Sequence, residues 1–281
     1  MNHIQNIEIK NFKSIRHQKI EDCRRVNVFI GYPNTGKTNI IEALSLFSIN
    51  QNNKISSFIR FGSLATLFFN GNVETSFSIT INNKQQQIGF YHRDNVIVLH
   101  NLSDSDKIFE EVFPKSLNKR KYFKIKNTED AEFIQPNVYE SLYFPEILRY
   151  EFLKSLNFKE GAHDFLQVPN GENIFDVISS NQYLRNEIQE LFKLNELKLR
   201  YDVGLQMYSI IKEIKDEIFS IPYSMIADTL QRLIFYKAAI ASSKQSVLLF
   251  EEPEAHMFPP YISKFTSDIV YDENNNQYFI A

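Results

Sequence analysis

The pattern of hydrophobic and polar positions predicts two strands and a helix within the first fifty residues. Between Ile4 and Phe12, single apolar residues stand among polar neighbours, which predicts an opening strand. The mainly apolar run from Val26 to Ile30 predicts a second, buried strand. From Ile40 to Phe47 the apolar residues recur at spacings of three and four, which predicts a helix with one apolar face.

The middle of the chain changes pattern twice. Apolar and polar residues alternate in 76–81 and 95–99, which predicts an antiparallel sheet with a turn at Asn82 and Asn83. From about residue 105 to residue 220 the composition becomes charged and aromatic. Apolar residues at helical spacing in 183–192 and 210–218 predict a helical insertion there.

The C-terminal sixty residues return to a helix and strand pattern. Helices are predicted over 227–241 and 262–270, and a strand over 278–281. The short apolar run Val247–Phe250 is typical of a central parallel strand. The whole pattern predicts an α/β fold with a mainly parallel central sheet, an antiparallel β lobe and a helical insertion.

Composition and charge mainly exclude classes of protein. Hydrophobic residues make up 43% of the 281 residues, and 25 Phe and 14 Tyr with no Trp predict an aromatic core. The net charge of −3 gives no global attraction to nucleic acid or to an anionic membrane. Cys23, the single cysteine, fits a reducing compartment, and no apolar stretch approaches membrane-spanning length. We therefore expect a cytoplasmic protein without a membrane partner.

A phosphate-binding pattern lies between the strand predicted at 26–30 and the helix that follows. Gly31, Gly36, Lys37 and Thr38 match G-x-x-x-x-G-K-S/T. In such a loop, backbone N–H groups and a helix N-terminus face the phosphates, the lysine neutralises them and the hydroxyl binds Mg²⁺. The alternative, a capping turn with a surface lysine, does not explain a Lys-Thr pair at the start of a helix.

A pair of carboxylates follows the predicted central strand. Glu251 and Glu252 come directly after Val247–Phe250, so both carboxylates are expected at the edge of the sheet where ligands of open α/β sheets bind. Glu251 is expected to hold the Mg²⁺ shell, and Glu252 to polarise the attacking water. The alternative is a solvated acidic turn.

These motifs resemble a known family of ATP-binding heads. Together with K-N-F-K-S at Lys10–Ser14 and E-P-E-A-H at Glu252–His256, they resemble ABC-type P-loop ATPases of the RecF, SMC and OLD group. The nearest resemblance is to OLD-like, AAA-type bacterial ATPases of DNA maintenance and anti-phage defence. Further matches to the family's phosphate-loop pattern are Asn34, Asn39, Glu42 and Ala43. The resemblance covers about the first 50 and the last 60 residues.

The resemblance implies an ABC-type head and assigns residues to ATP and Mg²⁺. It divides the chain into the N-terminal half of the head with the β lobe (1–105), the helical insertion (106–220) and the C-terminal part of the head (221–281). Glu252 is the implied catalytic residue, and Thr38 and Glu251 the implied Mg²⁺ ligands. The implied nucleotide-binding residues are Gly31, Asn34, Thr35, Gly36, Lys37, Thr38, Asn39, Lys13 and Arg232.

Such heads sandwich ATP between the phosphate loop of one subunit and a signature helix of the other, which implies a homodimer on ATP binding. If Arg232 is aligned with the signature, its usual Ser falls at Ala227 and its Gly at Thr229, which is a departure from the family pattern. The family also carries a switch histidine after the last strand. The chain ends at Ala281 before that point, so we expect that the C-terminal end of the head is lacking or that the protein lacks this switch.

The expected function is an ATPase head that dimerises on ATP and transmits closure to DNA or to an effector protein such as a nuclease. A basic segment with aromatic residues at 115–126 suits a nucleic-acid backbone, although a solvated strand face has the same composition. A nucleotide-sensing module with little turnover is the first alternative, because the signature is altered. A transporter-type ABC ATPase subunit and a small-molecule kinase fit the motifs at both ends less well.

Overall fold

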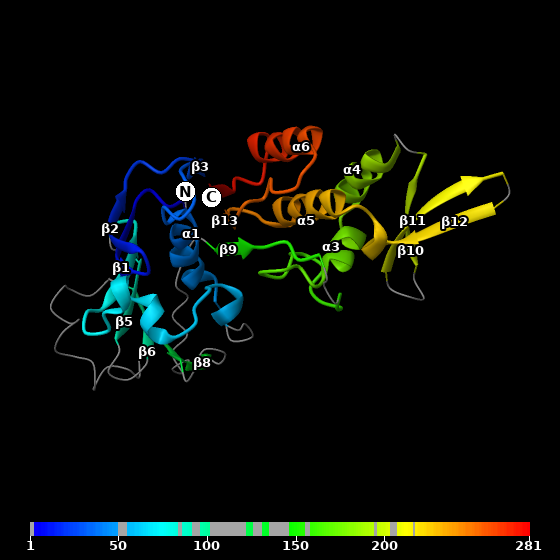
Figure 1. Cartoon of the computed structure of the whole chain (residues 1–281). Helices are drawn as coiled ribbons and strands as arrows, with labels where there is room; N and C mark the ends of the chain where they lie inside the picture. Colours follow the sequence, from blue (N-terminus) through cyan, green and yellow to red (C-terminus); the bar gives the residue numbers. More distant parts are fainter. Residues whose placement is uncertain are drawn as a thin grey trace. The chain divides into compact units, whose positions relative to one another are not determined.

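The structure is a computed structural model of the chain, which divides into two compact units (Figure 1). The first unit is Met1–Arg149 with Gln277–Ala281, and the second is Tyr150–Asn276. Each unit is described by itself. The structure describes residues 3–49, 55–83, 86–91, 96–101, 122–125, 131–134, 146–154, 158–193, 196–202, 207–215 and 217–281.

The first unit consists mainly of strands, with helix α1 directly after the phosphate loop. Its strands are β1 (Ile7–Phe12), β2 (Ile15–Ile20), β3 (Val26–Val28), β4 (Phe77–Ile81), β5 (Gln86–Tyr91), β6 (Val96–Asn101), β7 (Tyr122–Ile125), β8 (Ala131–Ile134), β9 (Ile147–Tyr150), whose last residue begins the second unit, and β14 (Gln277–Ile280). Its helices are α1 (Lys37–Ser45) and the short 3₁₀ turns η1 (Leu46–Ser48), η2 (Ile55–Ser57), η3 (Leu64–Leu67) and η4 (Phe69–Gly71).

The second unit is a group of helices with a small sheet. Its helices are α3 (Ile174–Ser180), α4 (Gln182–Lys193), α5 (Asp228–Ser242), α6 (Pro259–Val270) and the 3₁₀ turn η7 (Tyr223–Met225). Its strands are β10 (Lys198–Asp202), β11 (Met207–Ile214), β12 (Glu217–Pro222) and β13 (Val247–Phe250).

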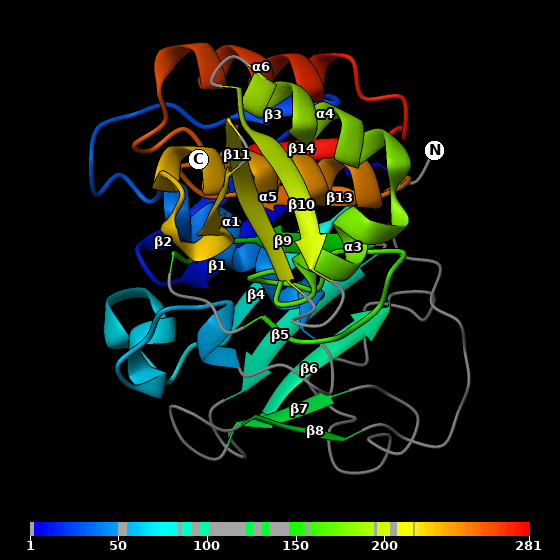
Figure 2. The same cartoon turned by 90° about the vertical axis from the view of Figure 1, so that its right-hand side faces the viewer.

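An antiparallel sheet dominates the first unit. Among the described residues its strand order is β2-β1-β4-β5-β6-β7-β8, and Figure 2 shows β4 to β8 following one another across the unit. Ile7 and Ile9 of β1 lie opposite Ile81 and Ile79 of β4, and all four side chains are buried. The period of two in the sequence therefore places one apolar face of each strand in the core.

A parallel pair of strands joins the two ends of the chain within the first unit. β14 pairs in parallel with β3, with Tyr278 opposite Val26. The buried amide of Gln277 accepts from Ile4 N at 2.7 Å and donates to Ile4 O at 2.8 Å. It also donates to Arg24 O at 2.9 Å. Gln277 thus binds Ile4, 273 residues away in the sequence, and Arg24, 253 residues away.

Most predicted elements are confirmed, including the α/β fold class, but two details are wrong. The helix predicted over 210–218 is the β11–β12 hairpin, in which Glu213 lies opposite Ile218 and Lys215 has a φ of 55° in the turn. Isoleucine suits both a strand and the apolar face of a helix, so the apolar pattern alone does not distinguish the two structures. The turn at Lys215 lets the two segments pair as strands. The strand predicted at 26–30 is present as β3, but the predicted burial is wrong, since Val28 is 55% exposed. An apolar run indicates a strand without specifying what packs against it.

The remaining predictions on the middle of the chain are only partly covered. The basic segment at 115–126 lies outside the described residues except for 122–125, which form β7. Asn82 and Asn83 both have positive φ angles after β4, as expected of turn residues. Within the described part of the chain, no helix has the length and apolar character needed to cross a membrane.

Three aromatic rings and a buried lysine connect the helices of the second unit. Tyr236 of α5 packs on Phe250 of β13 with ring centroids 5.0 Å apart and on Phe265 of α6 at 5.4 Å. One residue along α5, the ammonium of Lys237 lies 2.8 Å from Asp268 Oδ1 and 3.3 Å from Glu187 Oε2. Burial raises the pKa of the Asp268 carboxyl, and the hydrogen bond from Lys237 opposes that shift.

We predict that Lys237→Met destabilises the protein by about 2 kcal/mol at pH 7, because it leaves the carboxylate of Asp268 without its cation. Since the folded-state pKa of Asp268 is already raised, protonation favours the folded state, and the loss should shrink as the pH falls from neutrality towards the pKa of this carboxyl. Urea unfolding followed by circular dichroism at several pH values measures both effects. Lys193→Met, which removes an exposed lysine paired with Glu190, is the control. Equal midpoints for the two variants would contradict the prediction.

Candidate functional site

The predicted phosphate loop occupies residues 31–36 between β3 and α1, and its last residue has a conformation that favours glycine. Gly36 has φ 91° and ψ 8°, a left-handed conformation that residues with a Cβ rarely adopt. A Cβ at this position would also lie 3.0 Å from the hydroxyl of Ser14. No side chain caps the N-terminus of α1, so the N–H groups of its first turn remain available to an anion.

Lys37 folds back over the phosphate loop. Its ammonium donates to Gly31 O at 2.7 Å and to Tyr32 O at 2.9 Å, and the Thr35 hydroxyl donates to the same Tyr32 oxygen at 2.9 Å. The residues from Gly31 to Thr35 are exposed. Carbonyl and phosphate oxygens are both acceptors for an ammonium group, so a phosphate can replace the loop carbonyls as the partner of Lys37.

The β1–β2 turn lies against the start of α1 and contributes a second set of polar groups. Asn39 Nδ2 donates to Ser14 Oγ at 2.6 Å, and Lys13 precedes Ser14 with a φ of 49°. A pocket of about 690 Å³ opens beside this turn. It is lined by Lys13, Ser14, Asn39, Ser56, Ile59, Arg60, Phe61, Gly62 and Thr66.

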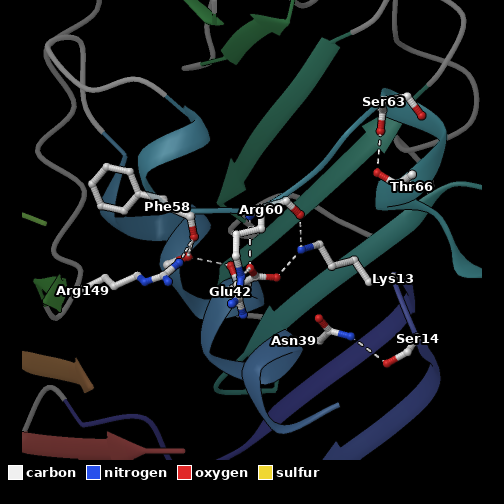
Figure 3. Close-up of polar contacts among 10 residues, drawn as sticks. Lys13, Ser14, Asn39, Glu42, Phe58, Arg60, Ser63, Thr66 and Arg149 are labelled. Atoms are coloured by element: carbon white, nitrogen blue, oxygen red, sulfur yellow. Dashed lines mark hydrogen bonds and ion pairs between the residues drawn. The ribbon is translucent and has the colours of Figure 1, made fainter. Parts of the chain in front are cut away.

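The fully buried carboxylate of Glu42 contacts two residues that line this pocket, Lys13 and Arg60 (Figure 3). Glu42 Oε2 forms an ion pair with Lys13, and Glu42 Oε1 accepts from Arg60 N and Arg60 Nε, each at 3.1 Å. The guanidinium of Arg149 donates to Phe58 O close by. Burial lowers the pKa of Lys13, Glu42 opposes that shift, and the charges of Arg60 and Arg149 add to the lowering.

The carboxylates predicted to act on Mg²⁺ and water lie in the second unit. All four residues of β13 are fully buried, and Glu251 and Glu252 follow directly as a half-buried and an exposed residue. Glu252 has a φ of 43°, an uncommon conformation for a residue with a side chain, and its carbonyl accepts from Ala255 N at 3.0 Å. The strand end is thus followed by a tight turn that exposes the Glu252 carboxylate.

The predicted signature helix, α5, begins without a hydroxyl cap. Ala227 occupies the N-cap position and no side chain caps the helix. Asp228 pairs with Lys154 at 2.9 Å, and the guanidinium of Arg232 lies 4.8 Å from the centroid of the Phe152 ring. Contact with an aromatic face gives this guanidinium a defined position.

The first unit therefore contains all of the predicted nucleotide-binding residues except Arg232, and the second unit contains Arg232, the predicted Mg²⁺ ligand Glu251 and the predicted catalytic residue Glu252. Those in the first unit are Gly31, Asn34, Thr35, Gly36, Lys37, Thr38, Asn39 and Lys13. Among the described residues, no group of three or more His, Cys, Asp or Glu side chains forms a metal site.

Sequence reasoning did not predict the contacts of Glu42, Arg60 and Arg149. Glu42 interrupts the apolar face of a predicted helix, and a carboxylate in such a position needs a cation. This pattern indicates a buried ion pair, but it does not identify the partners of Glu42, because Lys13 and Arg60 lie 29 and 18 residues away in the sequence.

Comparisons with known protein sequences give short matches only. No family model matches the chain. The "DNA replication and repair protein RecF" of Thermoanaerobacter sp. is 26% identical over 99 residues, which are 34% of this chain and 26% of that protein. The "ATP/GTP phosphatase" of Helicobacter pylori is 44% identical over 41 residues, which are 15% of this chain and 11% of that protein. The matches thus span about a quarter or less of these curated relatives.

Among solved structures, an SMC head bound to the C-terminal winged-helix domain of ScpA superimposes with a TM-score of 0.52 at 12% identity. The superposition covers 99% of this chain and 88% of that one. At this level of identity the likeness concerns the fold. The chain therefore has the α/β fold of that SMC head.

Proposed function

We propose that this chain is an ATP-binding and ATP-hydrolysing head that dimerises on ATP and passes its closure to DNA or to an effector protein. The observation that carries the proposal is the geometry of the predicted phosphate loop. The exposed residues 31–35 are followed by Gly36 and an uncapped helix N-terminus, and the Lys37 ammonium lies over the loop. Backbone N–H groups and a lysine ammonium in this arrangement suit a phosphate chain. The fold of the SMC head supports the same assignment.

ATP binding in this proposal exchanges one set of acceptors for another. Lys37 leaves the carbonyls of Gly31 and Tyr32 and binds phosphate oxygens, so the loop keeps its cation while its own carbonyls turn to solvent. The pocket lined by Lys13, Asn39 and Arg60 includes a residue from the first turn of α1, the helix that follows the loop, and it is large enough for part of a nucleotide.

Hydrolysis is assigned to Glu252, whose exposed carboxylate accepts a proton from the attacking water as a general base. The oxygen donors of Thr38 and Glu251 suit Mg²⁺, which prefers hydroxyl, carboxylate and phosphate oxygens. When bound, the metal ion supplies charge neutralisation on the transferred phosphate. Arg232, in the second turn of α5, is assigned to the nucleotide bound by the second subunit.

The second candidate is a nucleotide-sensing module with little turnover. The uncapped start of α5 favours it, because Ala227 offers no hydroxyl at the position where the signature helix of related heads carries serine. In this case ATP still binds the phosphate loop, but Glu252 makes no measurable contribution to phosphate release.

We predict that Lys37→Ala weakens Mg-ATP binding about a hundredfold, because the phosphates lose their charge-assisted hydrogen bond. Isothermal titration calorimetry measures the dissociation constant. Lys19→Ala, which removes an exposed lysine of β2 paired with Glu21, should leave it unchanged. Equal affinities of Lys37→Ala and wild type would contradict the assignment of the phosphate loop.

We predict that Glu252→Gln lowers phosphate release about a thousandfold while Mg-ATP binding persists, because the amide cannot accept the proton of the attacking water. Light scattering with and without Mg-ATP should then show a trapped dimer. Glu254→Gln, two residues along the same turn, is the matched control and should keep wild-type turnover. Phosphate release that Glu252→Gln leaves unchanged would favour the nucleotide-sensing module.

A further inference from the structure

Glu42 uses both of its carboxylate oxygens on groups that line the pocket beside the phosphate loop. Its side chain is fully buried, and it comes from the second turn of α1 rather than from the phosphate loop itself. One oxygen binds the ammonium of Lys13 from the β1–β2 turn. The other accepts two hydrogen bonds from Arg60, whose backbone N and Nε both lie 3.1 Å away (Figure 3).

The two cations differ in exposure, although they share this carboxylate. The side chain of Lys13 is 11% exposed, whereas that of Arg60 is 66% exposed. The Lys13 ammonium also donates to the Arg60 carbonyl, so the two residues are bound directly to each other. Both side chains line the pocket together with Asn39 of α1.

A carboxylate in this position has a physical task besides filling the core. Two like charges so close together repel each other, and a buried ammonium loses its hydration, unless an anion compensates both effects. Glu42 supplies that anion at a fixed position on α1, the helix that begins at Lys37. The positions of Lys13 and Arg60 relative to the phosphate loop are therefore set before any ligand arrives.

We infer that Glu42 is a positioning residue for nucleotide binding: it holds Lys13 and Arg60 at the pocket so that they receive an anionic phosphate group of the nucleotide. This inference rests on the proposed function. Glu42 does not touch the ligand and acts only through the two cations. Side chains that are already ordered lose little conformational freedom when a ligand binds. The affinity that Lys13 and Arg60 give to the nucleotide therefore depends on the Glu42 carboxylate, which orders them.

The test is a thermodynamic cycle on the affinity for Mg-ATP, measured by calorimetry. Glu42→Gln keeps the shape of the side chain and removes its charge, and it should weaken binding about tenfold. In a Lys13→Met/Arg60→Met background, which itself binds more weakly than wild type, the same change should have no further effect. A carboxylate with a merely structural role would cause the same loss, or none, in both backgrounds, and that result would overturn the inference.

Glu8→Gln is the matched control. Glu8 lies on β1, does not line the pocket, and also binds two basic side chains, those of Lys10 and His17. It should bind Mg-ATP as wild type does. If Glu42→Gln does not fold, Arg60→Met tests the inference instead, because Lys13 and the backbone N of Arg60 still bind the Glu42 carboxylate in this variant. Unchanged affinity of Arg60→Met overturns the inference.

The wild type separates the two levels of the proposal. A wild-type protein that does not bind Mg-ATP refutes the proposed function together with the role of Glu42. A wild type that binds, with a Glu42→Gln variant that binds equally well, refutes the role of Glu42 alone.

Discussion

The need to neutralise one buried charge organises the first unit around Glu42. A fully buried carboxylate is tolerated only with cations and hydrogen-bond donors around it, and Glu42 obtains them from the β1–β2 turn and from the loop after η2. These contacts fix Lys13 and Arg60 against α1. The neighbouring hydrogen bond from Asn39 to Ser14 then holds the same turn close to Gly36. The geometry of the phosphate loop thus depends on polar contacts made beside it.

The second unit meets a similar constraint with a lysine. Lys237 is almost fully buried between α4, α5 and α6, and two carboxylates compensate it. The aromatic rings of Tyr236, Phe250 and Phe265 surround the end of β13. Packing of this kind leaves few alternative positions for the turn that carries Glu251 and Glu252. The apolar contacts and the ion pairs of Lys237 thus involve the same helices, α5 and α6.

The predicted phosphate loop combines a left-handed glycine with a lysine bound to the loop's own carbonyls. Gly36 fixes the turn into α1, since its φ of 91° excludes most other residues. Lys37 instead rests on carbonyl oxygens that are weaker partners for an ammonium than a phosphate is. These hydrogen bonds hold the positive charge of Lys37 over the loop.

The sequence by itself determined the elements and the chemical motifs. Local patterns were sufficient for β1, α1, α4, α5 and β13, because periodicity records which faces of a strand or helix are buried. The glycines and Lys37 of the phosphate loop were equally readable, since their spacing is set by local backbone geometry. The hairpin at β11–β12 was not, because its isoleucines suit a helix face and a strand, and only pairing across the turn at Lys215 separates the two. Tertiary structure alone decided the partners of Glu42, since segments distant in the sequence supply the cations that a buried carboxylate requires.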